Sequence, residues 1–193
     1  IIASIIILII TNLLYYRALK SDLLSEMQTF SLLSSIPLIL LTALIFSEER
    51  NPIIILLAII SAGFLVWSHY EHHHLKISRK TLPYFIFIMI VAPFGGIISK
   101  TLLKTFDPIS LQLIRDFIIG VAFIIIFFKA IKQTPKKAYL PLILTNILTT
   151  IAWILYFFSY QKSGIIYTVL IFSLEPLLVY LTSIFLLKEK IHL

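Results

Sequence analysis

Two charged residues lie deep within apolar stretches of this sequence, where an ionised side chain needs a specific partner. Glu175 lies about ten residues into the apolar segment 165–187, which is roughly 15 Å along a helix at about 1.5 Å per residue. A carboxylate at that depth in a membrane costs a few kcal/mol unless it is paired, hydrated or protonated. Glu175 is therefore a candidate for proton coupling or for binding a cationic substrate. Alternatively, an ion pair with Arg115 of segment 108–128 fixes helix packing.

Asp116 adjoins Arg115 in the sequence. Adjacent residues of a helix point to different sides of it. We therefore expect Asp116 to face a loop or water rather than the site that contains Arg115.

Segment 139–160 has a polar face. An amide, a hydroxyl and three polar-tipped aromatic side chains recur at steps of three and four residues, which places them on one side of a helix: Asn146, Thr149, Trp153, Tyr156 and Tyr160. Such a set suits a cavity that binds small amphipathic molecules. The alternative is that Tyr156, and especially Tyr160, belong to the aromatic belt at the membrane surface. We predict that the first four of these residues, with Arg115 and Glu175, contact the substrate.

A helix break is predicted at Pro93, Gly95 and Gly96, within segment 83–99. Proline inside a helix removes a backbone hydrogen bond and bends the chain. Two interpretations stay open. Either the small residues allow neighbouring helices to approach closely, or irregular backbone lines a substrate cavity.

Long apolar segments must position these residues. Hydrophobic residues make up 60% of the 193 residues and charged residues only 13%, about half the charged fraction of a soluble domain. A membrane-spanning helix needs about 20 apolar residues, and lipid offers the backbone no hydrogen-bonding partners outside a helix or a closed barrel. The alternating pattern of barrel strands is absent. We predict seven helical spans, the first of them truncated: 1–16, 24–46, 52–67, 83–99, 108–128, 139–160 and 165–187.

The polar residues outside the spans argue against several other functions. The net charge of +7 comes from basic residues between spans, so it reflects topology rather than nucleic-acid binding. The sequence contains no cysteine and no GxxxxGK[ST] pattern, so we expect neither thiol chemistry nor nucleotide binding in this chain. The longest polar stretch, 68–82, contains four histidines with Glu71 as the one nearby carboxylate. We interpret it as a solvated linker between two halves, and we expect no metal and no cofactor.

A repeated pattern relates the two halves. With a constant offset of 141, residues 14–50 align with 155–191 without a gap, and Tyr15 meets Tyr156. Five spans separate the two copies, and an odd number inverts the second copy in the bilayer. Inverted repeats place a binding site near the midplane between them. The copies differ at Ser34, which aligns with Glu175.

Basic residues also bear on orientation. The loops after the first, third, fifth and seventh spans carry eleven Lys and Arg residues, and the opposite loops carry four. The positive-inside rule places the first set in the cytoplasm.

The chain resembles the drug/metabolite transporter superfamily, in particular its EamA-type branch. The resemblance rests on YYRALK, on the proline-containing span that ends in Glu48 and Glu49, on LEPLLVYLTSIFLLKEK, and on Asp107-Pro108 followed by LQLIRDF. The family pattern often has a glycine before the exit glutamate, and this chain has Ser47 and Lys188 instead. The resemblance implies an all-α membrane protein, a polytopic transmembrane helix bundle with two inverted five-helix repeats.

On that register the seven spans are helices three to nine of ten. Residues 1–67 are then the last three helices of the first repeat, 68–82 the linker, and 83–193 the first four helices of the second repeat. The usual cytoplasmic N-terminus of the family would place the linker outside, contrary to the charge count. Orientation stays open.

The resemblance implies a secondary transporter, an exporter of small metabolites or drugs that works by alternating access in the cell membrane. Its partners are then a small-molecule substrate and the lipid bilayer. Proton coupling is a hypothesis that rests on Glu175, and a homodimer is a further hypothesis. The alternatives are an integral-membrane enzyme that acts on lipid or prenyl substrates, and a channel. Such an enzyme usually shows clustered Asp, His or Ser at a membrane face, and a channel favours a ring of repeated polar residues.

Overall fold

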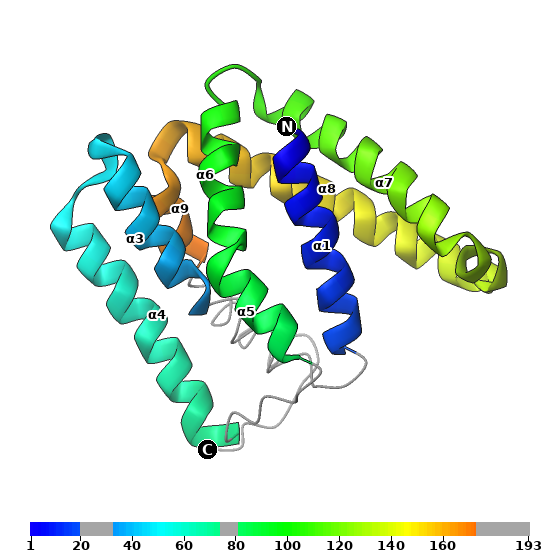
Figure 1. The fold of residues 1–193 in the computed structure, drawn as a ribbon, viewed down its shortest axis with the longest axis horizontal. Coiled ribbons are helices and arrows are strands. Elements are labelled where there is room, and N and C mark those ends of the chain that lie inside the picture. Colours follow the sequence, from blue (N-terminus) through cyan, green and yellow to red (C-terminus); the bar gives the residue numbers. More distant parts are fainter. Residues whose placement is uncertain (20–32, 74–80, 173–193) are drawn as a thin grey trace.

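The computed structural model describes residues 1–19, 33–73 and 81–172 (Figure 1). These residues form α-helices and short 3-10 turns, with no β-strand among them, in agreement with the predicted all-α membrane protein. The α-helices are α1 (Ile2–Leu19), α3 (Ser35–Ile45), α4 (Pro52–His73), α5 (Leu82–Ile90), α6 (Ala92–Leu102), α7 (Pro108–Gln133), α8 (Tyr139–Ser163) and α9 (Ile165–Phe172). Two 3-10 turns, η1 (Ser47–Glu49) and η2 (Lys136–Ala138), precede α4 and α8.

The helices pack in three groups (Figure 1). α3 and α4 form a pair at one side, α1 lies beside α5 and α6 in the centre, and α7 and α8 form a pair that extends away from the other side. α9 contacts α3, α4 and α8. Helices from before and after the predicted linker therefore share one bundle, because α1 and α3 both pack on α6.

The larger core cluster lies where α3, α6, α8 and α9 meet. Its buried members are Ile39, Phe46, Ala58, Leu103, Leu111, Phe157, Tyr160, Ile165, Ile166 and Val169. A smaller cluster joins α1 to α5 and consists of Ala18, Tyr84 and Ile88. Between membrane helices such contacts stabilise mainly through close packing, since lipid is as apolar as the side chains themselves.

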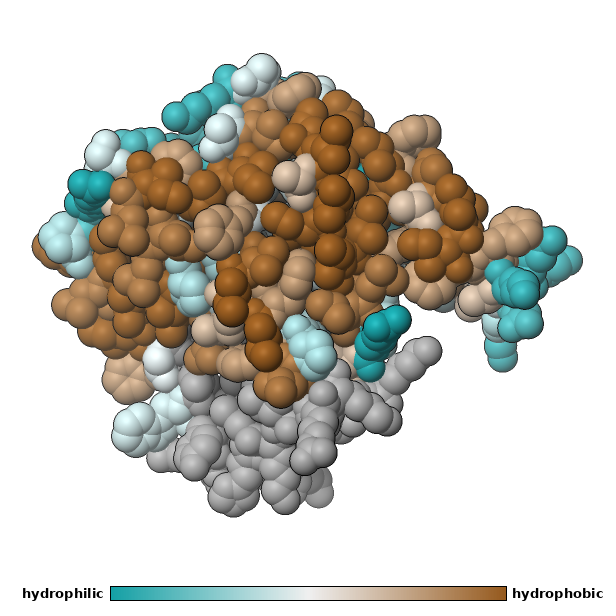
Figure 2. Space-filling view, in the orientation of Figure 1, coloured by the Kyte–Doolittle hydropathy of each residue, from teal (hydrophilic) through white to brown (hydrophobic). Residues whose placement is uncertain are grey.

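The outer surface is largely apolar, as a bilayer requires. Figure 2 shows hydrophobic residues over most of this face, with hydrophilic residues gathered toward its edges. On α7 and α8, large apolar side chains such as Phe117 and Leu148 are 74% and 67% exposed. Within the described residues, three helical stretches are long and apolar enough to cross a membrane: Leu82–Leu102, Pro108–Ile126 and Lys136–Ser163. The chain is therefore an integral membrane protein.

Two predicted helix starts are confirmed. α4 begins at Pro52 and α7 at Pro108, where proline loses no helical hydrogen bond. The residue before each proline caps the helix. The Asn51 side chain accepts hydrogen bonds from the backbone N–H groups of Ile53 and Ile54, and Asp107 Oδ1 accepts one from Ser110 N at 2.9 Å.

The helix ends differ from the prediction. α4 continues to His73, so residues 68–73, assigned to the linker, are helical. No glycine or proline interrupts this stretch, so the backbone ladder continues after the apolar pattern stops. α7 likewise runs beyond residue 128, but Phe127 has non-helical angles (φ −107°, ψ 19°) and marks a kink close to the predicted end. Residues 74–80 lie outside the described part of the chain.

Candidate functional site

Arg115 lies at the centre of the packed helices. Its side chain, on the inner face of α7, is only 2% exposed. One guanidinium N–H group donates to Ser99 Oγ on α6 at 3.0 Å, and the guanidinium carbon lies 5.0 Å from the ring centroid of Phe157 on α8. Cation–π contact of this kind contributes roughly 0.5–2 kcal/mol. Arg115 thus joins three helices.

The hydrogen bonding of Arg115 is incomplete. Its Nε is buried and has no hydrogen-bond partner among the described residues, and no described carboxylate forms a salt bridge with it. An unpaired buried donor costs about 1–3 kcal/mol, and more for a charged group. Ser99 itself is satisfied, because its hydroxyl donates to the Gly95 carbonyl and presents its oxygen to Arg115. The guanidinium therefore has spare capacity for an acceptor.

Asp116 corrects a prediction. Instead of facing a loop or water, it lies between α7 and α8 and accepts hydrogen bonds from Gln112 Nε2 at 2.7 Å and from Thr150 Oγ1 at 2.8 Å. The prediction was wrong because the packing of α8 on α7 supplies Thr150, whose position no local pattern indicates. The i,i+4 spacing of Gln112 and Asp116 was a local signal for the first of these bonds.

The predicted polar face of α8 is divided by the fold. Tyr156 and Tyr160 share a hydroxyl–hydroxyl hydrogen bond of 2.9 Å, and Tyr160 is only 3% exposed. Tyr160 therefore does not belong to an aromatic belt at the membrane surface. Trp153 contacts Tyr156 edge to face, with ring centroids 5.2 Å apart, and is 43% exposed.

The other end of this face lies away from the bundle. Asn146 and Thr149 are exposed, and the Asn146 amide donates to the Leu142 carbonyl of its own helix at 2.7 Å. Both residues belong to the first half of α8, and this half of the helix projects with α7 away from the other helices in Figure 1. Among the described residues, Phe157 lies against Arg115 and also near the rings of both tyrosines, whereas Asn146 and Thr149 lie apart from them.

The chain breaks between α5 and α6 at Val91, just before Pro93. Val91 keeps helical angles (φ −95°, ψ −41°), so the break is a bend rather than an unwound loop. The glycines lie at helix contacts. A Cβ on Gly95 would meet Ile7 of α1 at 3.4 Å, and one on Gly96 would lie 2.7 Å from Leu38 of α3. This geometry favours the packing interpretation of the break.

A second buried polar cluster surrounds Glu49, which the sequence analysis treated only as part of a charged span exit. Its carboxylate accepts hydrogen bonds from Lys100 Nζ of α6 and from the backbone N–H groups of Ile165 (3.0 Å) and Ile166 (2.8 Å) at the start of α9. The Glu49 side chain is 6% exposed and that of Lys100 12%. Sequence spacing could not reveal this cluster, since its members lie up to 117 positions apart.

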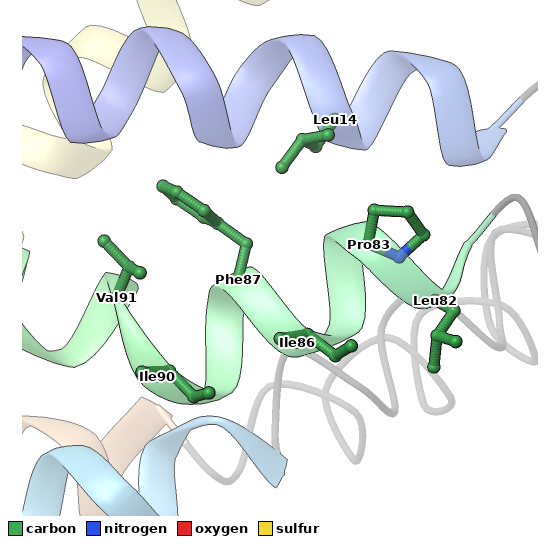
Figure 3. Close-up of a pocket in the computed structure, with 7 residues that line it drawn as sticks. All are labelled: Leu14, Leu82, Pro83, Ile86, Phe87, Ile90 and Val91. Atoms are coloured by element: carbon green, nitrogen blue, oxygen red, sulfur yellow. The ribbon is translucent and has the colours of Figure 1, made fainter.

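An apolar groove of about 510 Å³ lies between α1 and α5 (Figure 3). In Figure 3, Leu14 of α1 faces Pro83 and Phe87 of α5. All the residues that line the groove are apolar: Leu14, Leu82, Pro83, Ile86, Phe87, Ile90 and Val91. The groove therefore offers side-chain contacts but no polar group that would select a solute.

Several predicted residues fall outside the described part of the chain. Glu175 lies within 173–193, so neither its proposed role nor its pairing with Arg115 is addressed by the structure. The side chains of the linker histidines are likewise undescribed. Among the described residues no group of three or more His, Asp or Glu side chains is arranged to hold a metal ion.

Comparison with known proteins identifies the class of the chain. The EamA-like transporter family matches residues 79–193, which include α5 to α9 and the Arg115 site. No curated protein and no solved structure matches the chain.

Proposed function

The chain belongs to the EamA-like transporter family, and we propose that it exports small amphipathic metabolites or drugs as a secondary transporter of the cell membrane. In this proposal two inverted halves alternate around a central site. Solute recognition at that site combines an aromatic, hydroxyl-bearing wall with one fixed positive charge.

Arg115 is the observation that carries this proposal. A positive charge in the middle of a membrane protein is retained at a cost and usually serves a transport pathway. Arg115 is held by Ser99 and Phe157, but its Nε has no acceptor within the part of the chain that the structure describes. A solute with an anionic or neutral acceptor group supplies the missing partner. The fixed contacts position the guanidinium beforehand, so that binding requires little reordering.

The tyrosine pair adjoins this location, because Phe157 lies against Arg115 and near the rings of both tyrosines. Tyr160 lies against Gly96 of α6. A Cβ on Gly96 would be 3.6 Å from the Tyr160 hydroxyl oxygen. Tyr156 packs on Phe172 with ring centroids 4.5 Å apart. Aromatic side chains with polar tips bind amphipathic solutes by combining apolar area with hydrogen bonding. Trp153 extends this wall toward the exposed half of α8.

Flux measurements test the proposal. The full-length protein is reconstituted in proteoliposomes, and the release of labelled small solutes is followed with and without an imposed proton gradient. We expect saturable flux that a competing solute reduces and that leaves the solute chemically unchanged. Protein-free liposomes are the control. Product chemistry in place of flux would contradict the proposal.

Proton coupling through Glu175 is the finer part of the proposal. Glu175→Gln removes the titratable proton while preserving size and one acceptor oxygen. We expect the substituted protein to bind solute but to lose the dependence of transport on pH. Unchanged pH-dependent transport by the Gln protein would exclude Glu175 as the coupling residue.

A further inference from the structure

The Glu49 cluster joins segments from both halves of the chain at one end of the bundle. Glu49 belongs to η1, between α3 and α4, whereas Lys100 lies in the last turn of α6 and Ile165 begins α9. In Figure 1 the α3–α4 connection, the end of α6 and the start of α9 lie together in the upper part of the view. A single carboxylate thus binds one cation and two backbone amides across the boundary between the halves.

Gly164 makes room for this carboxylate. It has a positive φ of 89°, a backbone conformation that other residues adopt only with strain. A Cβ at this position would lie 2.7 Å from Glu49 Cδ and 2.8 Å from Oε1. The α8–α9 connection is therefore shaped around the Glu49 side chain. The positive end of the α9 dipole adds to the attraction.

Each partner of Glu49 has an alternative when the contact breaks. Lys100 Nζ lies 3.6 Å from Glu48, whose side chain is 57% exposed, and 4.4 Å from the centroid of the Phe46 ring. The freed amides of Ile165 and Ile166 would meet water, as the first amides of an exposed helix do. Opening therefore avoids the large penalty of leaving an uncompensated buried charge. A contact with these properties can exist in two states.

We propose that Glu49 and Lys100 form an ion-pair gate that holds this end of the transporter closed and separates when this end opens. The inference rests on the proposed function, because alternating access requires the halves to part at each end in turn. The contact spans those halves and is nearly buried. Rupture of this contact is then part of the transport cycle rather than local unfolding.

Labelling of a buried thiol tests the gate without any solute. These 193 residues contain no cysteine, so Val169→Cys introduces one thiol among them, one turn into α9, where Val169 is 6% exposed. The same protein without this substitution gives the background labelling rate. Full-length protein in proteoliposomes is treated with a membrane-impermeant maleimide. We expect Glu49→Gln to raise the labelling rate about tenfold, the change produced by a shift of roughly 1.4 kcal/mol in the open–closed equilibrium.

Glu48→Gln is the matched control, since it removes a neighbouring carboxylate that has no contact with the α9 amides among the described residues. Equal labelling rates in the Glu49→Gln and Glu48→Gln proteins would overturn the gate. If Glu49→Gln does not yield folded protein, Lys100→Gln replaces it, with Lys104→Gln as its control. The same tenfold difference is expected there, and its absence also overturns the proposal.

A cross-link links the gate to transport. A short bis-methanethiosulfonate reagent is applied to a Glu49→Cys, Lys100→Cys protein, and solute flux is compared before and after reduction. We expect flux to fall at least about tenfold on cross-linking and to recover with dithiothreitol. Each single-cysteine protein is the control. Undiminished flux in the cross-linked protein overturns the gate proposal. Absence of flux in the natural protein instead counts against the proposed function. In that case the labelling rates alone test the gate.

Discussion

Buried polar side chains in this bundle differ in how completely they are paired. The Thr168 hydroxyl contacts both Ser159 and the Gly164 carbonyl, and both carboxylate oxygens of Asp116 accept hydrogen bonds. Arg115 Nε and Thr42 Oγ1 are buried with no partner among the described residues. Fully paired groups hold helices together. Unpaired groups are costly to retain and are therefore the stronger candidates for function.

Arg115→Met separates a structural from a functional role. Replacing a buried charge that has no countercharge among the described residues with an apolar side chain of similar length removes a desolvation penalty of roughly several kcal/mol. We therefore expect unchanged or higher thermal stability in detergent. Transport should fall about 10- to 100-fold, because a hydrogen bond to a charged group contributes roughly 1.5–3 kcal/mol. Fluorescence-detected unfolding and proteoliposome flux provide the two measurements.

Lys132→Met is the control for this substitution, because Lys132 is an exposed cation in the last turn of the same helix. Lys132→Met should leave thermal stability and transport unchanged. If Arg115→Met instead lowers stability and the addition of Glu175→Gln restores it, the two residues form a structural ion pair. The interpretation of Arg115 as a solute-binding residue would then fail.

Gly164→Ala should destabilise the protein. The positive φ and the 2.7 Å approach to Glu49 both disfavour a side chain here. A strained backbone position costs on the order of 1–3 kcal/mol. Gly120→Ala in α7 is the control, since nothing lies within 4 Å of its Cβ, and alanine favours a helix by about 0.5–1 kcal/mol. Opposite shifts of the thermal midpoint are expected, and equal shifts would contradict the structure.

Arg115 is buried as its position in the sequence predicts, because an arginine flanked by apolar helix residues can be recognised locally. The aromatic-belt alternative for Tyr160 and the predicted position of Asp116 were wrong, and Glu49 received no role of its own. Asp116 and Glu49 have partners on other elements, and Tyr160, which bonds Tyr156 of its own helix, lies against Gly96 of α6. Local spacing shows which side of a helix a residue occupies, but not which helix covers that side.

The starts of helices follow from local chemistry. Proline at the first position and a capping side chain just before it satisfy the first turn without help from distant residues, and both α4 and α7 begin in this way. The ends of helices are predicted less accurately from local chemistry than their starts. The apolar pattern stops near residue 67, but α4 continues to His73 because the following residues contain no breaker. Hydropathy defines the part of a helix in the membrane, not the whole helix.

The cap of α7 should make stability depend on pH. The Ser110 hydroxyl and backbone N–H stabilise the charged Asp107 carboxylate and lower its pKa. A lowered folded pKa adds stability that is present above the ordinary aspartate pKa of about 3.9 and is lost as pH falls through the folded value. The thermal midpoint of the natural protein should therefore decline more steeply below about pH 4 than that of Asp107→Asn, which caps the helix without a titratable charge. Parallel curves for the two proteins would show that Asp107 is not charged in the cap.

The α7–α8 pair extends away from the other described helices (Figure 1). The part of α7 before its kink at Phe127, Pro108–Ile126, has 19 residues, about 28 Å at 1.5 Å per residue, and much of its surface is apolar and exposed. A bilayer, or further helices within it, must cover this surface. The two ends of α7 therefore lie near opposite faces of the membrane.

Single cysteines at those ends determine the orientation. Thr105→Cys precedes α7 and Gln133→Cys ends it, and both residues are exposed. The loop between α7 and α8 is rich in lysine, and the positive-inside rule places it, with position 133, in the cytoplasm. An impermeant maleimide applied to intact cells should therefore label position 105 and not position 133, and permeabilised cells should show labelling of both. The reverse pattern would support the orientation usual for the family, with the linker outside.

Membrane insertion, the helical class and the family follow from local properties of the chain, because lipid imposes its length and hydropathy requirements on each segment separately. The match at residues 79–193 agrees with that inference. The arrangement of the helices depends on contacts between distant segments. Packing brings Ser99 to Arg115, Thr150 to Asp116, and the first amides of α9 to the carboxylate of Glu49. Among mostly apolar surfaces many helix arrangements have similar energies, so the small residues and a few polar pairs select one arrangement, and their partners become visible once the helices are assembled.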